Sequence, residues 1–304
     1  MARNLAPERQ AARAIRSLTA FGQPRHNQRD DGKVHSVGTA RSYEQTFRTA
    51  ATHLLERHDV SLYHGTPEQV REYLDARSTE IGQTQLNGER RALELYYREA
   101  RGDATFSLPH TRSEVEQVQT ARAYTDAQVA LLTERMSARM SLSTRVADAA
   151  GLRASELYTL QRIEERAPSS HRTWSSERFV GREDWSRYTV DGKGGLVREV
   201  RLPAALAREL ESTRLAEPKP IRDREVRLET RYDVAGGRNF SNAFSRDAQR
   251  HLGWSEGAHG LRHSYAQRRM DELGDRGKSY SEALGIVSQE LGHFRPEITE
   301  VYLR

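Results

Sequence analysis

The sequence predicts a mainly helical protein with a small antiparallel β-sheet, built as a helical domain followed by a mixed α+β domain. Three observations support this prediction. Apolar residues recur at helical spacing in residues 38–106 and again after residue 123, and residues that can cap a helix precede several of these stretches. Two apolar runs flank the glycine-rich segment Asp191–Gly195, which is typical of a β-hairpin. The length of 304 residues suits two domains better than one.

The helical domain, residues 38–106, is expected to contain three helices. The first begins at Thr39 and the third covers residues 84–101. The second begins after Thr66, which can cap it, while Pro67 suits the first turn and Gln69 completes a capping box. The side chains expected on the buried faces of these helices are Tyr43, Phe47, Leu54, Leu55, Val70, Tyr73, Leu74, Leu93, Tyr96, Tyr97 and Ala100.

Residues 107–122 are polar and contain Pro109, so they are expected to be a linker before the second domain, residues 123–304. Thr125 opens a further capping box, and the helix after that one is expected to break at Gly151. Strands are expected at residues 179–190 and 196–202. From Pro203 onward the sequence predicts mostly helix, over residues 203–216, 239–252, 260–273, 281–291 and 297–304.

Residues 1–37 are expected to form a basic, flexible arm that holds one short helical segment, residues 6–18. Residues 1–41 carry eight basic and three acidic side chains, so this region accounts for the whole formal net charge of +5. Arginine supplies 44 of the 48 basic residues, either through genome composition or because guanidinium groups bind phosphate in a bidentate manner. With a sequence pI near 9.5, nucleic acid is the expected partner class.

The composition also excludes several kinds of chemistry. The chain has no cysteine, which removes disulfides, thiolate catalysis and cysteine-ligated zinc. No run approaches the ~18–20 apolar residues of a membrane span, and the N-terminus lacks the apolar region of a signal peptide. A cytoplasmic protein without a membrane partner is therefore expected.

Four short segments carry residues suited to chemistry: GLRASEL with Arg153 and Glu156, the GKGG hairpin with Lys193, HGLRH at residues 259–263, and LGH at residues 291–293 followed by Tyr302. Each has an ordinary structural explanation when taken alone. Arg153 can pair with Glu156, Lys193 can be a solvated turn residue, and Tyr302 can be a packing aromatic. The order and spacing of the four segments favour a common site.

Together these segments resemble the tyrosine recombinase/integrase family over about residues 38–304. The matching segments are GLRASEL, DGKGGLVREV, HGLRH and LGHFRPEITEVY. They carry the candidate site residues in the order Arg, Lys, His-x-x-Arg, His and Tyr. The resemblance implies a helical core-binding domain plus a mixed α+β catalytic domain, which together form a C-shaped clamp on double-stranded DNA. It implies a site-specific DNA recombinase that works through a 3′-phosphotyrosine intermediate.

The residue types suit phosphoryl transfer independently of the resemblance. A phosphodiester concentrates negative charge on its non-bridging oxygens in the transition state. Arg153 and Arg262 can hold those oxygens with planar forks that keep their charge. A phenol with a pKa near 10 needs a base before it can attack, and histidine titrates in the useful range. Lys193 can supply a proton to the leaving oxygen.

The resemblance implies a role for each residue. Tyr302 resembles the nucleophile, and Lys193 resembles the general acid that protonates the 5′-oxygen. His259 resembles the acceptor of the tyrosine proton. The covalent intermediate conserves the energy of the broken bond, so no cofactor, ATP or metal is expected.

The same resemblance implies that Arg153, Arg262 and His293 stabilise the transition state. Glu156 is expected to orient Arg153, and His263 is expected to support the fold.

A zinc site is the alternative explanation for His259 and His263, which lie four residues apart. Gly260 occupies the position at which a zinc hydrolase motif carries its catalytic glutamate, and no third ligand is evident. We therefore expect no metal at this place.

DNA contacts are expected from arginines on helices of both domains, mostly to phosphates and partly to base edges. The partners implied are a specific DNA site, a homo-tetramer on two duplexes, and an accessory DNA-bending or directionality factor, in the nucleoid of a prokaryote. The candidate contact residues are Arg41, Arg48, Arg90, Arg91, Arg238 and Arg246.

Some features depart from the family pattern. The intervals from Arg153 to Lys193 and from Arg262 to His293 are long, and only two residues follow Tyr302, so either the chain is truncated or its tetramer contacts differ. A type IB topoisomerase and a catalytically silent DNA-binding recombination factor are the alternative functions. Long loops and the basic arm favour a mobile-element integrase over a chromosome-dimer resolvase.

Overall fold

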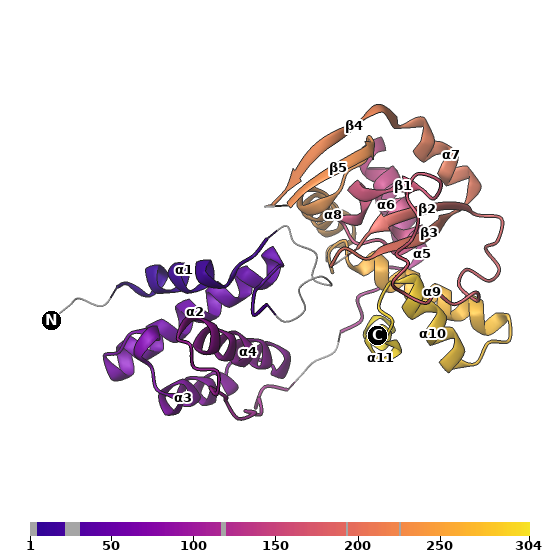
Figure 1. The fold of residues 1–304 in the computed structure, drawn as a ribbon. Coiled ribbons are helices and arrows are strands. Elements are labelled where there is room, and N and C mark those ends of the chain that lie inside the picture. Colours follow the sequence, from indigo (N-terminus) through magenta and orange to yellow (C-terminus); the bar gives the residue numbers. More distant parts are fainter. Residues whose placement is uncertain (1–4, 22–30, 117–119, 193, 225) are drawn as a thin grey trace. The chain divides into compact units, whose positions relative to one another are not determined.

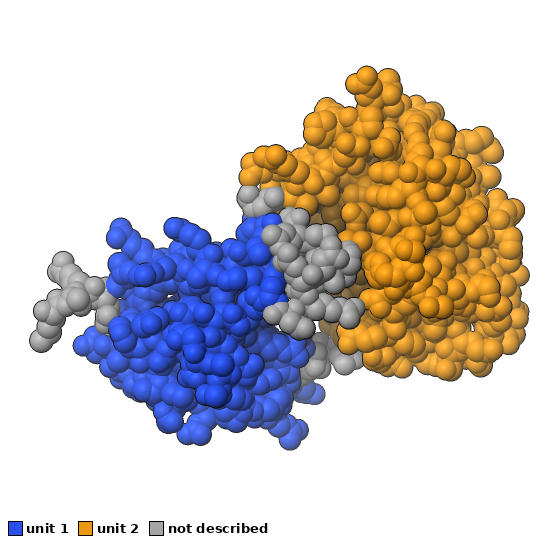
Figure 2. All heavy atoms as spheres, in the orientation of Figure 1, with its two compact units in different colours: residues 1–118 blue, residues 119–304 orange. Residues whose placement is uncertain are grey.

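The computed structural model describes residues 5–21, 31–116, 120–192, 194–224 and 226–304. The chain divides into two compact units, Met1–Val118 and Gln119–Arg304 (Figure 2). The boundary falls within the segment expected to be a linker. In the described residues no helix has the length and apolar character needed to cross a membrane.

Unit 1 is a small helical bundle. Its elements are α1 (Pro7–Leu18), α2 (Val37–His58), η2 (Leu62–His64), α3 (Pro67–Ser78) and α4 (Gln83–Ala100) (Figure 1). The capping box at Thr66 is present, with the Thr66 hydroxyl and the Gln69 side chain each bonded to the other's backbone N–H. Most of the predicted core side chains are fully enclosed, including Phe47, Val70 and Tyr97. The three predicted helices of this unit are therefore confirmed.

The expectation of a flexible N-terminal arm is wrong for the part of the arm that the structure describes. The short helix is present as α1, but Ala11, Ala14, Ile15 and Leu18 are buried in one cluster with residues of α2 and α4. Their i, i+3, i+4, i+7 spacing is that of an amphipathic helix, which the polar composition of the segment obscured. The arm also returns to this unit after residue 30, where the N–H of Val34 donates to the carbonyl of Leu18 (2.7 Å). Residues 1–4 and 22–30 lie outside the described part.

Unit 2 combines helices with two antiparallel sheets, as predicted for the fold class. Its helices surround the three-stranded sheet β1-β2-β3, in which Tyr188 of β2 faces Val200 of β3. The elements are α5 (Asp126–Arg135), α6 (Ala138–Ala150), η3 (Glu156–Thr159), β1 (Gln161–Arg162), β2 (Ser186–Asp191), β3 (Val197–Leu202), α7 (Ala204–Ser212), β4 (Arg214–Asp223), β5 (Val226–Tyr232), α8 (Gly237–Leu252), α9 (Gly260–Asp275), α10 (Tyr280–Glu290), α11 (Pro296–Thr299) and η4 (Glu300–Tyr302) (Figure 1).

The sequence analysis missed the hairpin β4-β5 at residues 214–232, and the helix predicted over residues 203–216 is wrong at residues 214–216, where β4 begins. In β5, Val226, Leu228, Thr230 and Tyr232 alternate with charged residues, which is the period of a strand. The two prolines of β4 lack an N–H, and this strand pairs only with β5 in its two-stranded sheet. The predicted strand at residues 179–190 is regular only from Ser186 onward.

If α1 is an integral part of unit 1, Leu18→Ala will lower the free energy of unfolding of that unit by about 2–5 kcal/mol, because a fully buried leucine leaves a cavity. All three tryptophans lie in unit 2, so hydrogen exchange of peptides from residues 31–116 is the suitable measurement. Arg13→Ala, on the exposed side of α1, is the control and should change little. Equal exchange in both variants would contradict the packing of α1.

Candidate active site

The first predicted motif lies where α6 ends. Gly151 has a left-handed backbone (φ 58°), and a Cβ atom there would lie 2.7 Å from the ring of Tyr265. The turn leads directly into η3, so Arg153 and Glu156 face each other. The backbone N–H of Arg153 donates to Glu156 Oε2 (2.8 Å), and its Nη1 donates to Oε1 (2.6 Å). The local ion pair expected from the sequence is therefore present.

Glu156 is also the centre of a larger buried cluster. Its Oε2 accepts from Arg198 Nη2 (2.7 Å) and lies 4.0 Å from Arg262 Nη1. Burial by itself raises the pKa of a carboxyl, but Arg198, Arg153 and Arg262 outweigh it and lower the pKa of Glu156 to about 2. The carboxylate is therefore ionised at neutral pH and serves as counter-charge for three guanidinium groups.

Arg262 lies on α9 and is fully buried. Its Nη1 donates to the carbonyl of Gly151 (2.5 Å), and its Nη2 donates to the carbonyl of Leu291. Burial and the positive charge of Arg153 lower the pKa of Arg262 to about 9, so the guanidinium still carries its charge at neutral pH. Arg262 thereby connects the GLRASEL segment, through Gly151, to the LGH segment, through Leu291.

Tyr302, in η4, lies among the remaining predicted site residues. Its ring centre is 5.4 Å from that of His259, 4.7 Å from His263 and 5.1 Å from His293. The guanidinium carbon of Arg262 lies 5.5 Å from the centre of the same ring. The fold thus brings Tyr302 beside His259, which is 43 positions away in the sequence.

His293 has a defined protonation state in this arrangement. Its Nε2 lies 3.1 Å from Arg262 Nη2, which can only donate, so Nε2 is the acceptor. The ring proton therefore belongs on Nδ1, which lies 3.2 Å from the Thr299 hydroxyl. Burial, Arg262 and Arg153 lower the pKa of His293 to about 3, which keeps the imidazole neutral.

His259 and His263, at the start of α9, are neutral for the same physical reasons. Burial, followed by Arg262 and His263, lowers the pKa of His259 to about 4. Burial and Arg122 lower the pKa of His263 to about 4 as well. As a whole residue, His259 is more accessible to solvent than His263, which is buried. A neutral imidazole beside Tyr302 is able to accept a proton.

Lys193 lies outside the described residues, but its neighbour Gly192 shows where the β2-β3 turn begins. A Cβ atom on Gly192 would lie 3.3 Å from Glu156 Oε1 and 3.9 Å from Arg153 Nη1. The start of the predicted hairpin therefore borders the arginine cluster.

The predicted DNA-contact arginines fall into two groups. Arg90 is partly buried, and its guanidinium donates to Glu94 (3.0 Å) and to the carbonyl of Leu108 (3.2 Å), so it holds the segment after α4. The others have exposed side chains, on α2, α4 and α8: Arg41, Arg48, Arg91, Arg238 and Arg246.

Sequence reasoning missed Arg198, which is as deeply buried as Glu156 and donates to the carbonyl of Glu290 (2.7 Å). A signal was present in the sequence. In strand β3, Arg198 alternates in phase with Val200 and Leu202, so it occupies an inward-facing position that ordinarily holds an apolar residue.

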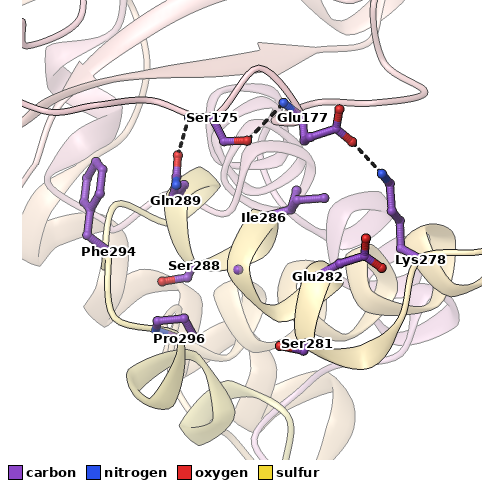
Figure 3. Close-up of a pocket in the computed structure, with 11 residues that line it drawn as sticks. Ser175, Glu177, Lys278, Ser281, Glu282, Ile286, Ser288, Gln289, Phe294 and Pro296 are labelled. Carbon is purple, nitrogen blue, oxygen red and sulfur yellow. Dashed lines mark hydrogen bonds and ion pairs between the residues drawn. The ribbon is translucent and has the colours of Figure 1, made fainter.

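A separate hollow lies beside the turn that carries Phe294 and Pro296 (Figure 3). It is lined by residues of α10 and of the loop before β2. Lys278 bonds Glu177 (2.5 Å), and the N–H of Ser175 donates to Gln289 Oε1 (2.7 Å). None of the residues predicted for the active site lines this hollow.

No protein-family model matches the sequence, and no curated protein matches it either. Solved structures do match in fold. The XerH site-specific recombinase bound to palindromic difH substrate has a TM-score of 0.57 at 14% identity, covering 99% of this chain and 94% of that one. A lambda integrase dimer bound to a COC′ core site has a TM-score of 0.57 at 15% identity, covering 99% and 77%. The Tn1549 transposon integrase in complex with transposon right end DNA has a TM-score of 0.53 at 13% identity, covering 99% and 95%.

These matches extend over nearly the whole chain, so the protein has the fold of these recombinases and integrases over both of its units. The fold expected from the four motifs is confirmed at this level.

Removal of the buried counter-charge should destabilise unit 2 strongly. Glu156→Gln leaves Arg198 and Arg262 buried without a negative counter-charge, so we expect a loss of about 3–5 kcal/mol in the free energy of unfolding. Tryptophan fluorescence during urea denaturation reports on this unit alone. The control is Glu209→Gln, which breaks a more exposed pair with Arg145 and should cost about 1 kcal/mol or less. Equal losses in the two variants would contradict the role of the buried cluster.

Acid should destabilise unit 2 below about pH 6.5. The unfolded chain binds protons on His293 below that pH, whereas the folded chain does not until about pH 3, so stability falls as the pH drops through this window. We expect His293 to account for about 2 kcal/mol of the loss between pH 7 and pH 5. Urea denaturation at several pH values should show a shallower slope for His293→Asn than for the control His251→Asn. Identical slopes would contradict the neutral state of His293.

Proposed function

We propose that this protein is a site-specific DNA recombinase that cleaves and rejoins DNA strands through Tyr302. The observation that supports the proposal most strongly is the position of Tyr302 between neutral histidines and a buried, charged arginine. A tyrosine that only packs in the core needs neither a proton acceptor, such as a neutral histidine, nor a charged arginine near its ring. The shared fold with recombinases and integrases supports the same reaction class.

In the proposed reaction, the Tyr302 hydroxyl oxygen attacks the phosphorus of a DNA phosphodiester. A bond forms between that oxygen and phosphorus, and the bond from phosphorus to the 5′-oxygen breaks. His259 takes the phenol proton, and Lys193 gives a proton to the leaving 5′-oxygen, so protons and charge balance. The reverse reaction with a new 5′-hydroxyl rejoins the strand and regenerates Tyr302.

Two arginines act on the phosphate in this proposal. Arg153 is partly exposed, with a quarter of its side chain accessible, so its guanidinium can reach a bound phosphate while Glu156 fixes its orientation. Arg262 supplies positive charge beside Tyr302, and the neutral His293 accepts a hydrogen bond from Arg262 and holds it in place. His263 packs against the ring of Tyr302 and fixes its position.

The exposed arginines of α2, α4 and α8 are proposed to contact DNA phosphates. Solved structures of the same fold include XerH with its difH substrate and a lambda integrase tetramer on a Holliday junction. By analogy we propose a homo-tetramer on two DNA sites, in which both units of each chain hold the duplex. We also propose that a mobile element encodes the protein, and that it works in the nucleoid with an accessory DNA-bending or directionality factor.

Covalent capture tests this function. The full chain is incubated with sheared DNA of the source organism and denatured, and the attached DNA is sequenced. We expect adducts at one short inverted repeat, their complete loss in Tyr302→Phe, and retained DNA binding by that variant. Tyr280→Phe, which alters an exposed tyrosine of the same unit, is the matched control and should form adducts normally.

Three results would contradict the proposal in different ways. Adducts that persist in Tyr302→Phe would exclude Tyr302 as the nucleophile. Tyr302-dependent adducts scattered without a consensus would indicate a topoisomerase, and DNA binding without any adduct would indicate a catalytically silent factor.

A further inference from the structure

Two histidines at the end of α2 lie beside a glutamate of α3 in unit 1. His58 Nε2 is 3.1 Å from Glu72 Oε2, and the ligand atoms of His53, His58 and Glu72 all lie within 4.8 Å of one another. We propose that these three side chains bind a zinc ion that joins α2 to α3. The site is independent of the proposed strand cleavage, whose catalytic residues lie in unit 2.

One histidine nitrogen in this cluster lacks a hydrogen bond. Nε2 of His53 is buried and makes no hydrogen bond in the part of the chain that the structure describes. A buried polar atom without a partner is costly, and this one has the lone pair that a metal ligand needs when the imidazole carries its proton on Nδ1. Nε2 of His58 is also buried and lies 3.1 Å from Glu72 Oε2. A bound cation would satisfy both nitrogens and the carboxylate at once.

The spacing of the three ligand atoms suits a small tetrahedral ion. Zinc bonds of about 2.0–2.2 Å place tetrahedral ligand atoms roughly 3.3–3.6 Å apart, close to the separation already present between His58 and Glu72. Glu72 is half exposed and can rotate to close the wider gaps. Two histidines and one carboxylate leave the fourth position to water.

Two acidic side chains lie near the histidines. Glu56 and Glu72 place negative charge around His53, against the positive charge of Arg57. The final turn of α2, which ends at His58, directs its carbonyl groups toward this end of the helix, where the dipole favours positive charge.

The test uses Co²⁺ as a spectroscopic substitute for Zn²⁺. The full chain is purified without a histidine tag, treated with chelator, and titrated with Co²⁺ while visible absorbance is recorded. We expect tetrahedral Co²⁺ bands at one equivalent per chain, displaced by Zn²⁺. Each of His53→Gln, His58→Gln and Glu72→Gln should weaken binding at least about tenfold, in line with the loss of one of three ligands.

His64→Gln is the matched control, because His64 bonds Ser61 in the same unit and should leave the bands unchanged. Glu72→Gln alters a half-exposed side chain, and far-UV circular dichroism verifies that it folds. Absence of tetrahedral bands would overturn the proposal. So would bands that survive all three variants but disappear in His263→Gln, because the metal would then lie in unit 2. Tyr302→Phe leaves this site untouched, so failure of the zinc proposal is distinguishable from failure of the recombinase proposal.

Discussion

The ion cluster around Glu156 is the interaction on which the rest of unit 2 depends. One buried carboxylate accepts charge-assisted hydrogen bonds from Arg153 and Arg198 and lies close to Arg262. Three guanidinium groups converge there, so without this carboxylate their mutual repulsion would oppose the fold. The cluster ties together η3, strand β3 and helix α9, which come from distant parts of the sequence.

The same cluster determines the chemistry around Tyr302. One negative charge for three positive charges leaves the site with a net positive potential. That potential, added to burial, lowers the pKa of His259 and of His293 and keeps both neutral. It is also complementary to a phosphodiester. A site that holds a phosphate and keeps a neutral base beside a tyrosine meets the main requirements for attack on phosphorus.

Local sequence rules predicted much of this architecture. The capping boxes at Thr66 and Thr125 begin helices as expected, because a hydroxyl and a glutamine three residues apart satisfy the same backbone groups in any context. The four motifs converge as their order and spacing predicted, except that Lys193 itself stays a prediction. Of the arginine cluster, the sequence predicted the pair of Arg153 with Glu156 and the convergence of Arg153 with Arg262, but not Arg198.

The features that the sequence analysis did not predict share a physical cause. Polar or charged composition concealed the apolar face of α1 and the alternating pattern of β5, because average composition does not reveal periodicity. Arg198 was concealed because a buried arginine in a strand is stabilised by a carboxylate elsewhere in the sequence. Its partner Glu156 is more than forty residues away, and only the folded chain brings the two together.

The central claim is that Glu156 positions the arginines that we propose to act on the scissile phosphate. The most direct test is the single-turnover rate of strand cleavage by Glu156→Gln, on a DNA fragment recovered by covalent capture with the unaltered protein. The measurement is made at a temperature where tryptophan fluorescence shows the variant to be folded. We predict a fall of about 100-fold or more in the cleavage rate, with DNA affinity reduced less than about threefold. An unchanged cleavage rate in the folded variant would contradict the account.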